Sequence, residues 1–113
     1  MFEIYKSEST GKFHFRLKSS NGQIVFTGQG YANRKGCENG IASVKKNSAD
    51  DSKFEVKEAA NGKLYFVLLA ANKQVIGQSQ MYKEKAGVLK GIASVKKNAA
   101  SDVVKDLTGI PLF

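Results

Sequence analysis

The side chains best suited to catalysis in this sequence are its one histidine and its one cysteine, His14 and Cys37. His14 falls in an alternating strand pattern with no nucleophile at a fixed spacing, which is typical of an exposed strand residue. Cys37 lies on the apolar stripe of a helical pattern, where a thiol is buried and unreactive. One histidine and one cysteine also provide neither a zinc-ligand set nor an internal disulfide. We therefore expect no catalytic residue, no metal and no cofactor, in a protein that is not an enzyme.

Two lysine pairs have the charge needed to neutralise phosphate groups. They are Lys45-Lys46 and Lys96-Lys97, which stand at the same place in two copies of one sequence word. The segment 34–47 has four basic residues against one acidic residue, and the segment 83–98 has five against one, within a formal net charge of +8. The other interpretation is a pair of solvated helix ends, where cations interact favourably with the helix dipole.

A basic strand face is a second candidate for phosphate contact. In the alternating segment 12–18, the side chains of His14, Arg16 and Lys18 face the same way. Some DNA-binding modules present such residues from a helix-backed sheet to a nucleic-acid groove. The expected register places Glu3 opposite Arg16, however, where the two charges would pair. A plain solvent-exposed face is the alternative.

The corresponding face of the second copy is apolar. Its residues are Tyr65, Val67, Leu69 and Ile76, at the positions of His14, Arg16, Lys18 and Val25. A strand that is apolar on both faces needs to be covered. Either the two copies arrange so that this face is internal, or it is a contact surface for a second chain or another protein.

These candidate residues belong to two copies of one unit, because the word from Gly40 to Asn47 recurs letter for letter from Gly91 to Asn98. A copy on its own would hold about 50 residues, near the limit at which one hydrophobic core offsets chain entropy. We therefore expect residues 1–113 to form a single domain with a shared core. The first repeat covers 2–50 and the second 54–101, and in the tail 102–113 two valines favour a short strand.

Hydrophobic periodicity predicts the same order of elements in both copies. Strand patterns cover residues 2–6, 12–18 and 23–29, and restart at residues 54, 63 and 74. Helical patterns run to about residues 46 and 97, the first of them capped by Asn33. The predicted fold class is α+β, a tandem β-β-β-α duplication with antiparallel sheets each covered by a helix.

The Asn21-Gly22 pair predicts a two-residue type I′ hairpin turn. This turn sets Leu17 opposite Phe26, and it places Ile24 on the core face and Val25 on the outer face. In the second copy, an expected three-residue loop ending at Gly62 pairs the strands so that their core faces agree.

Each predicted helix contains two glycines one turn apart, Gly36 and Gly40 in the first copy and Gly87 and Gly91 in the second. A glycine inside a helix costs about 0.5–1 kcal/mol relative to alanine, so these positions need a compensating reason. Close packing of the helix on its neighbours is the first interpretation. A backbone surface left bare for a ligand or partner is the second.

Composition bounds the class of protein. Apolar residues make up 42% of the chain and charged residues 25%, as in globular domains. No apolar run approaches the ~20 residues of a membrane span. The first residues show a strand pattern, so we expect no signal peptide. A single cysteine suits a reducing compartment, and we expect a cytoplasmic protein without a membrane partner.

The repeated word Asn-Gly-Ile-Ala-Ser-Val-Lys-Lys-Asn at 39–47, its second copy and the preceding Tyr31 and Tyr82 resemble the YegP-like family of small uncharacterised bacterial proteins. The resemblance covers nearly the whole chain, with Lys90 in place of Asn39 as a small departure. It implies a tandem β-β-β-α duplication in a soluble bacterial protein. It supplies no activity, cofactor or catalytic residue.

Two functions follow from these patterns. The leading hypothesis is a non-catalytic interaction module that uses the apolar face of the second copy for a protein partner or for self-association. The alternative is weak, largely non-specific nucleic-acid binding through the helix lysines and the strand face of the first copy.

Overall fold

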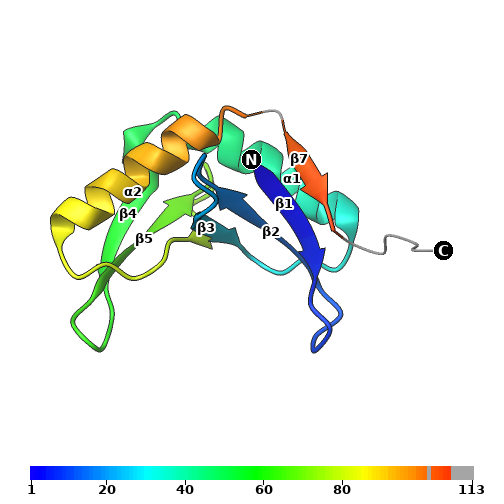
Figure 1. Ribbon diagram of the computed structural model, residues 1–113, viewed down its shortest axis with the longest axis horizontal. Coiled ribbons are helices and arrows are strands. Elements are labelled where there is room, and N and C mark those ends of the chain that lie inside the picture. The colour runs from blue at the N-terminus through cyan, green and yellow to red at the C-terminus, as the bar shows by residue number, and fades with distance from the viewer. Residues whose placement is uncertain (102, 108–113) are drawn as a thin grey trace.

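The computed structural model describes residues 1–101 and 103–107 and shows the predicted order of elements (Figure 1). The first repeat consists of β1 (Phe2–Lys6), β2 (Phe13–Lys18), β3 (Ile24–Gly28) and α1 (Arg34–Asn47). A 3-10 turn, η1 (Asp51–Lys53), leads to β4 (Phe54–Glu58), β5 (Leu64–Leu69), β6 (Val75–Gln78) and α2 (Lys85–Asn98). The strand expected in the tail is β7 (Val104–Asp106), while residues 108–113 lie outside the described part. The tandem β-β-β-α duplication is confirmed.

All seven strands form one sheet in the order β4-β5-β6-β3-β2-β1-β7. The third strands of the two repeats pair antiparallel at the seam, with Thr27 opposite Gln78 and Gly28 opposite Gly77. The two sheets expected from the sequence are therefore the halves of one continuous sheet. Strand β7 extends this sheet beyond β1, in the parallel direction.

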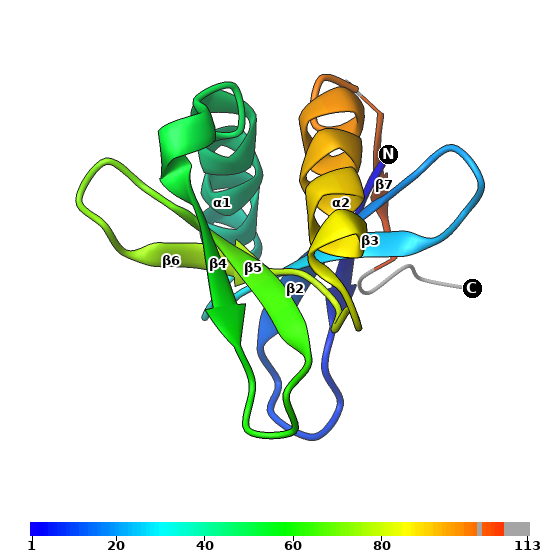
Figure 2. The ribbon, with the colours of Figure 1, turned by 90° about the vertical axis from the view of Figure 1, so that its left-hand side faces the viewer.

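Both helices lie on the same face of the sheet (Figure 2). Helix α1 packs on β2 and reaches across the seam to β5 and β6, while α2 packs on β5 and reaches to β3 and β2. One buried cluster joins the repeats, and within it the rings of Phe26 and Phe66 stack with their centroids 6.5 Å apart. Neither described helix is long and apolar enough to cross a membrane.

The first hairpin differs from its prediction in the length of its loop and in which residue of β3 faces the core. The loop at Asn21-Gly22 has three residues, because Ser19 N–H donates to the carbonyl of Gln23, and of the two expected positive φ angles only that of Gly22 (85°) occurs. A bulge beside Leu17 then restores the expected pairing of Leu17 with Phe26. The bulge turns Val25, not Ile24, into the core.

The second repeat has the same bulge, between Leu68 and Leu69. Ile76, which was expected on the outer sheet face, is consequently part of the core. Other register predictions are confirmed, since Val56 lies opposite Phe66, Phe54 opposite Leu68 and Glu3 opposite Arg16.

Close packing explains one glycine in each helix. A Cβ at Gly40 would lie 2.8 Å from the ring of Phe15 and still closer to the hydroxyl of Tyr31, and one at Gly91 would meet Phe66 and Tyr82 in the same way. Tyr31 is itself stacked on Phe15, with the ring centroids 6.2 Å apart, so it has little room to move. The packing interpretation of Gly40 and Gly91 is therefore confirmed.

We expect Gly40→Ala to destabilise the fold by about 1–3 kcal/mol, because overpacking exceeds the gain in helix propensity. Chemical denaturation followed by circular dichroism measures this change. Gly36→Ala is the matched control, since a Cβ there stays at 3.3 Å or more from its neighbours, and its stability should remain within about 0.5 kcal/mol of the parent. Equal losses at both positions would contradict the packing argument.

Lys73 is the one described residue other than glycine with positive φ, at 67°, and it occupies the loop position that Gly22 holds in the first repeat. We expect Lys73→Gly to stabilise the protein by about 0.5–1 kcal/mol, because glycine adopts this conformation without steric cost. The reciprocal Gly22→Lys should destabilise it by a similar amount, since a Cβ there meets no atom within 4 Å and only backbone strain changes. Thermal melting of both variants checks the pair, and shifts of the same sign would refute it.

Candidate protein-interaction site

The apolar outer face predicted from the second repeat is largely inaccessible. Val67 is only 3% exposed and Ile76 lies in the core, while Tyr65 and Leu69 are half-buried. Little continuous apolar surface therefore remains on this face for a partner.

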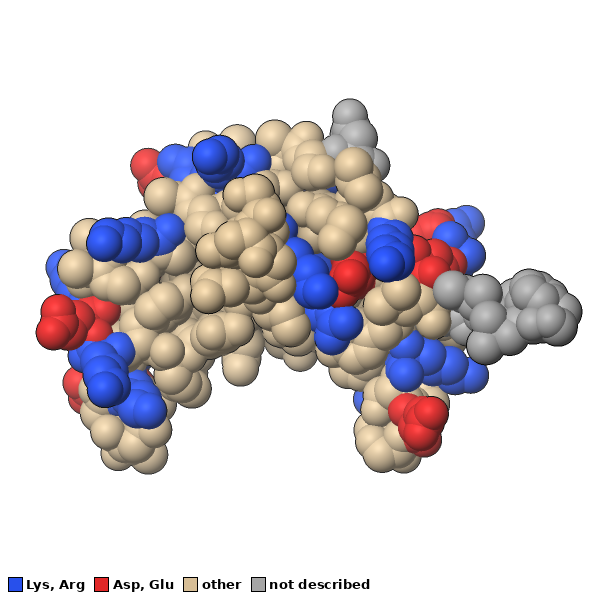
Figure 3. Space-filling view, in the orientation of Figure 1, with Lys and Arg blue, Asp and Glu red and all other residues tan. Residues whose placement is uncertain are grey.

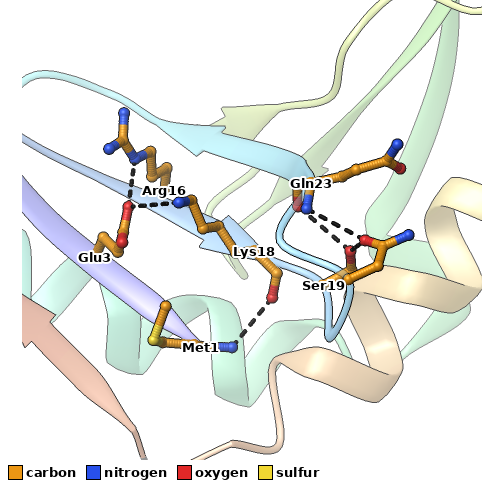
Figure 4. Close-up of polar contacts among 7 residues, drawn as sticks. Met1, Glu3, Arg16, Lys18, Ser19 and Gln23 are labelled. Atoms are coloured by element: carbon orange, nitrogen blue, oxygen red, sulfur yellow. Dashed lines mark hydrogen bonds and ion pairs between the residues drawn. The ribbon is translucent and has the colours of Figure 1, made fainter.

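The basic strand face of the first repeat forms a compact charged cluster (Figure 4). Arg16 Nε donates to Glu3 Oε1 at 2.8 Å, and Lys18 Nζ lies 3.5 Å from the same oxygen. His14 stacks on the ring of Tyr5, with centroids 5.4 Å apart, and the Arg16 guanidinium lies over that ring. The predicted pairing of Glu3 with Arg16 is confirmed, and it engages part of the charge that phosphate binding would need.

Glu3 is nearly buried and remains ionised. Burial alone would raise the pKa of its carboxyl, but the hydrogen bond from Arg16 and the charges of Arg16 and Lys18 together hold the pKa below its ordinary value of 4.5. A carboxyl with a lowered pKa stabilises the folded state at neutral pH, and this stabilisation is lost as the pH falls through the folded-state pKa.

The helix lysines differ in their contacts. The carboxyl ends of both helices lie on the same side of the molecule, separated from each other in Figure 2. Lys96 contacts Asp51, and Lys45 lies over the ring of Phe2, while Lys46 and Lys97 are exposed. Figure 3 shows the basic side chains of one face in separate groups with neutral and acidic residues between them.

Cys37 is a free, fully buried thiol on the core side of α1. Burial raises the pKa of this thiol to about 11, with smaller contributions from nearby acidic side chains. A thiol with so high a pKa is protonated at neutral pH and unreactive as a nucleophile. Within the described residues, no three potential metal-binding side chains cluster together.

One group of accessible apolar side chains lies at the end of the sheet formed by β4. Val56 of β4 is 42% exposed and Leu89 of α2 is 54% exposed, with the half-buried Ile92 one turn further along the helix. We call these three residues and Lys85 the edge groove, because they stand at the repeat positions of four residues that line a shallow pocket in the first repeat. β4 ends the sheet, and no strand of the described chain pairs with its outer side.

Backbone hydrogen bonding shows which groups of β4 face outward. Ala59 N–H donates to the carbonyl of Lys63, so Lys57 and Glu55 direct their backbone groups toward β5 by strand alternation. Val56 and Glu58 consequently direct their N–H and C=O groups toward the open edge.

The edge groove was not identified from the sequence, although one signal was present. Leu89 stands where the first repeat has Glu38, next to the predicted apolar stripe of the helix. A leucine outside that stripe widens the apolar face of α2 toward β4.

Comparison with known proteins gives a consistent picture. A family described as a domain of unknown function, DUF1508, matches residues 8–55 and 59–106. The chain is 52% identical over 103 residues to a UPF0339 protein of Pasteurella multocida, covering 91% of this chain and 90% of the relative. It is 49% identical over 107 residues to the UPF0339 protein YegP of Escherichia coli K12, covering 95% and 96%.

Two solved structures share the fold. The solution NMR structure of YegP from Escherichia coli has a TM-score of 0.90 and 48% identity, covering 96% of this chain and 92% of that one. The solution NMR structure of a UPF0339 protein from Shewanella oneidensis has a TM-score of 0.88 and 42% identity, covering 95% and 90%.

We expect Glu3→Gln to destabilise the protein by about 1–3 kcal/mol at pH 7, because a buried charged hydrogen bond is lost. The deficit should shrink as the pH falls below the ordinary carboxyl pKa of 4.5 and through the lower folded-state pKa of Glu3, because the parent carboxyl then becomes protonated in the folded state too. Glu55→Gln is the matched control at the corresponding position of β4, where the exposed carboxylate pairs only with Lys57 among the described residues. Urea denaturation at pH 7 and pH 3 tests this, and a deficit independent of pH would count against the charge argument.

Proposed function

This chain belongs to the DUF1508 family of YegP-like UPF0339 proteins, and within that family we propose that it is a non-catalytic interaction module that binds an extended segment of another protein at the open edge of its sheet. The observation that carries the proposal is the difference between the two ends of the sheet. The outer side of β1 pairs with β7, whereas within the described residues no strand pairs with the outer side of β4, beside which Val56 and Leu89 are exposed.

Strand addition is the binding mode that fits this end. An extended segment that joins a sheet edge gains main-chain hydrogen bonds, and its alternate side chains enter the adjoining groove. β4 offers the outward N–H and C=O groups of Val56, and Leu89 and Ile92 supply an apolar wall. Exposed edges are usually blocked, because they otherwise pair with foreign strands.

The charged residues of β4 are compatible with this mode. Glu55 and Lys57 alternate with Val56, so their side chains lie on the sheet face opposite the helices, where Lys57 Nζ is 3.1 Å from Glu55 Oε1. Both pair with β5 through their backbone groups. On the face of β4 toward α2, the side chain between these two charged residues is therefore the apolar Val56.

Nucleic-acid binding receives less support. Arg16 and Lys18 share the Glu3 carboxylate, Lys96 contacts Asp51, and helix carboxyl ends repel phosphate. Duplex DNA binding that falls steeply as salt rises would favour this alternative. A cytoplasmic location is part of the proposal, since a buried free thiol suits a reducing compartment.

We expect the immobilised chain to select extended peptides from a random twelve-residue library. Val56→Pro removes the outward N–H at a position where an edge strand tolerates proline, and Leu89→Glu introduces the acidic residue of the first repeat. Each variant should weaken binding of the selected peptides at least tenfold, as measured by fluorescence anisotropy.

The matched control is Glu38→Leu, which makes the converse change in α1 and should leave peptide affinity unchanged. Thermal melts establish that every variant is folded. Peptides that bind both edge variants as well as the parent would contradict the proposal. So would a dimer, seen by light scattering, that dissociates upon Val56→Pro, because a second copy would then occupy the edge.

A further inference from the structure

We propose that the edge groove binds a segment of another protein that lies parallel to β4 and carries an apolar residue followed two positions later by an aspartate or glutamate. This inference rests on the proposed function and specifies the partner segment. Its basis lies in the chain itself, because the matching groove of the first repeat is bordered by β7, in which Val104 is followed by Lys105 and Asp106.

The two grooves correspond residue by residue. In the first repeat Ile4, Arg34, Glu38, Ile41 and Val104 line one shallow pocket between β1, α1 and β7. The repeat places Val56 at the position of Ile4, and Lys85, Leu89 and Ile92 at those of Arg34, Glu38 and Ile41. The two grooves therefore share an apolar floor and a basic residue at the start of the helix.

Burial differs between the grooves as the presence of β7 predicts. Ile4 is 0% exposed, whereas Val56 is 42% exposed. Ile41 is buried and its counterpart Ile92 is half-buried, and the same holds for Phe2 and Phe54. An apolar side chain beside β4, in the place that Val104 takes beside β1, would cover part of this surface.

The direction of the docked strand follows from the repeat. Each family unit extends from the second strand of one repeat through its helix to the following strand, so β7 corresponds to the beginning of β4. In the first repeat, the strand after the helix is β4, and it pairs with β5. The equivalent place for β7, after α2, would be beside β2, but β1 already pairs there. β7 therefore pairs with the outer side of β1 and runs parallel to it. The free edge of β4 presents the same geometry to a strand from another molecule.

Main-chain groups define where that strand begins to pair. In the first repeat Phe2 N–H donates to Val103 O at 3.0 Å, and Leu107 N–H donates to Ile4 O at 2.7 Å. On β4, Phe54 N–H is engaged by Asp51 O of the 3-10 turn. The carbonyl of Val56, which matches that of Ile4, is thus the first strong acceptor for the incoming strand.

The acidic preference comes from the residue at the start of each helix. Arg34 Nη1 lies 2.5 Å from Asp106 Oδ2, and its Nε lies 3.8 Å from Glu38. Lys85 occupies the matching position, and among the described residues no carboxylate pairs with it. The second repeat also lacks the helix glutamate that pairs with Arg34, because Leu89 stands at the position of Glu38. An incoming carboxylate therefore meets an uncompensated cation.

The test uses a fluorescein-labelled synthetic peptide with the sequence of residues 101–107, Ser-Asp-Val-Val-Lys-Asp-Leu, and the full chain. We expect saturable binding by anisotropy. Replacing the second aspartate of the peptide by lysine should weaken binding at least fivefold, and Lys85→Glu in the protein should do the same. Combining the two changes should restore affinity, because the charges are exchanged.

Arg34→Glu is the control, since it alters the matching residue of the first repeat and should leave peptide affinity unchanged. Peptide binding that depends on Arg34 and ignores Lys85 would overturn the inference, because the peptide would then be displacing β7. If library peptides require Val56 and Leu89 but show no acidic preference and ignore Lys85→Glu, the inference fails while the proposed function stands. If no peptide depends on Val56 or Leu89, the proposed function itself fails.

Discussion

The close approach of β3 and β6 at the centre of the sheet is the constraint on which the rest of this structure depends. A Cβ at Gly77 would lie 2.4 Å from the carbonyl oxygen of Thr27, and one at Gly28 would lie 2.2 Å from the ring of Phe15. Glycine at these two positions lets the third strands pair and lets the aromatic rings beneath them stack across the seam. Because the strands join there, each helix contacts strands of both repeats, and the buried side chains of the two repeats form one cluster.

The repeated word in each helix is explained by packing. Gly40 and Gly91 admit the tyrosines that precede the helices, and Ile41 and Val44 face the core. The final asparagine of each word turns back, since Asn47 Nδ2 donates to Ser43 O and Asn98 Nδ2 donates to Ser94 O, both at 2.8 Å. The lysine pairs are the part of the word that this packing does not explain.

Patterns with a strong local cause were predictable from the sequence. The alternation of apolar and polar residues predicted the strands, and the duplication predicted the fold class. Asn33 predicted the cap of the first helix, and its Oδ1 accepts a hydrogen bond from Gly36 N–H at 2.8 Å. The bulges that turn Val25 and Ile76 inward were not predictable, because a three-residue loop plus a bulge gives the same pairing of Leu17 with Phe26 as a two-residue loop. The joining of the sheets, and hence the open edge at β4, depends on contacts between distant segments that no local pattern encodes.

The short length of β7 affects how the protein can associate. With only three residues, and with a lysine in the middle, it is a poor template for further strands. The β7 end of the sheet is therefore a poorer site for strand addition than the five-residue β4, because a short strand with a central charge offers few main-chain groups to an incoming strand.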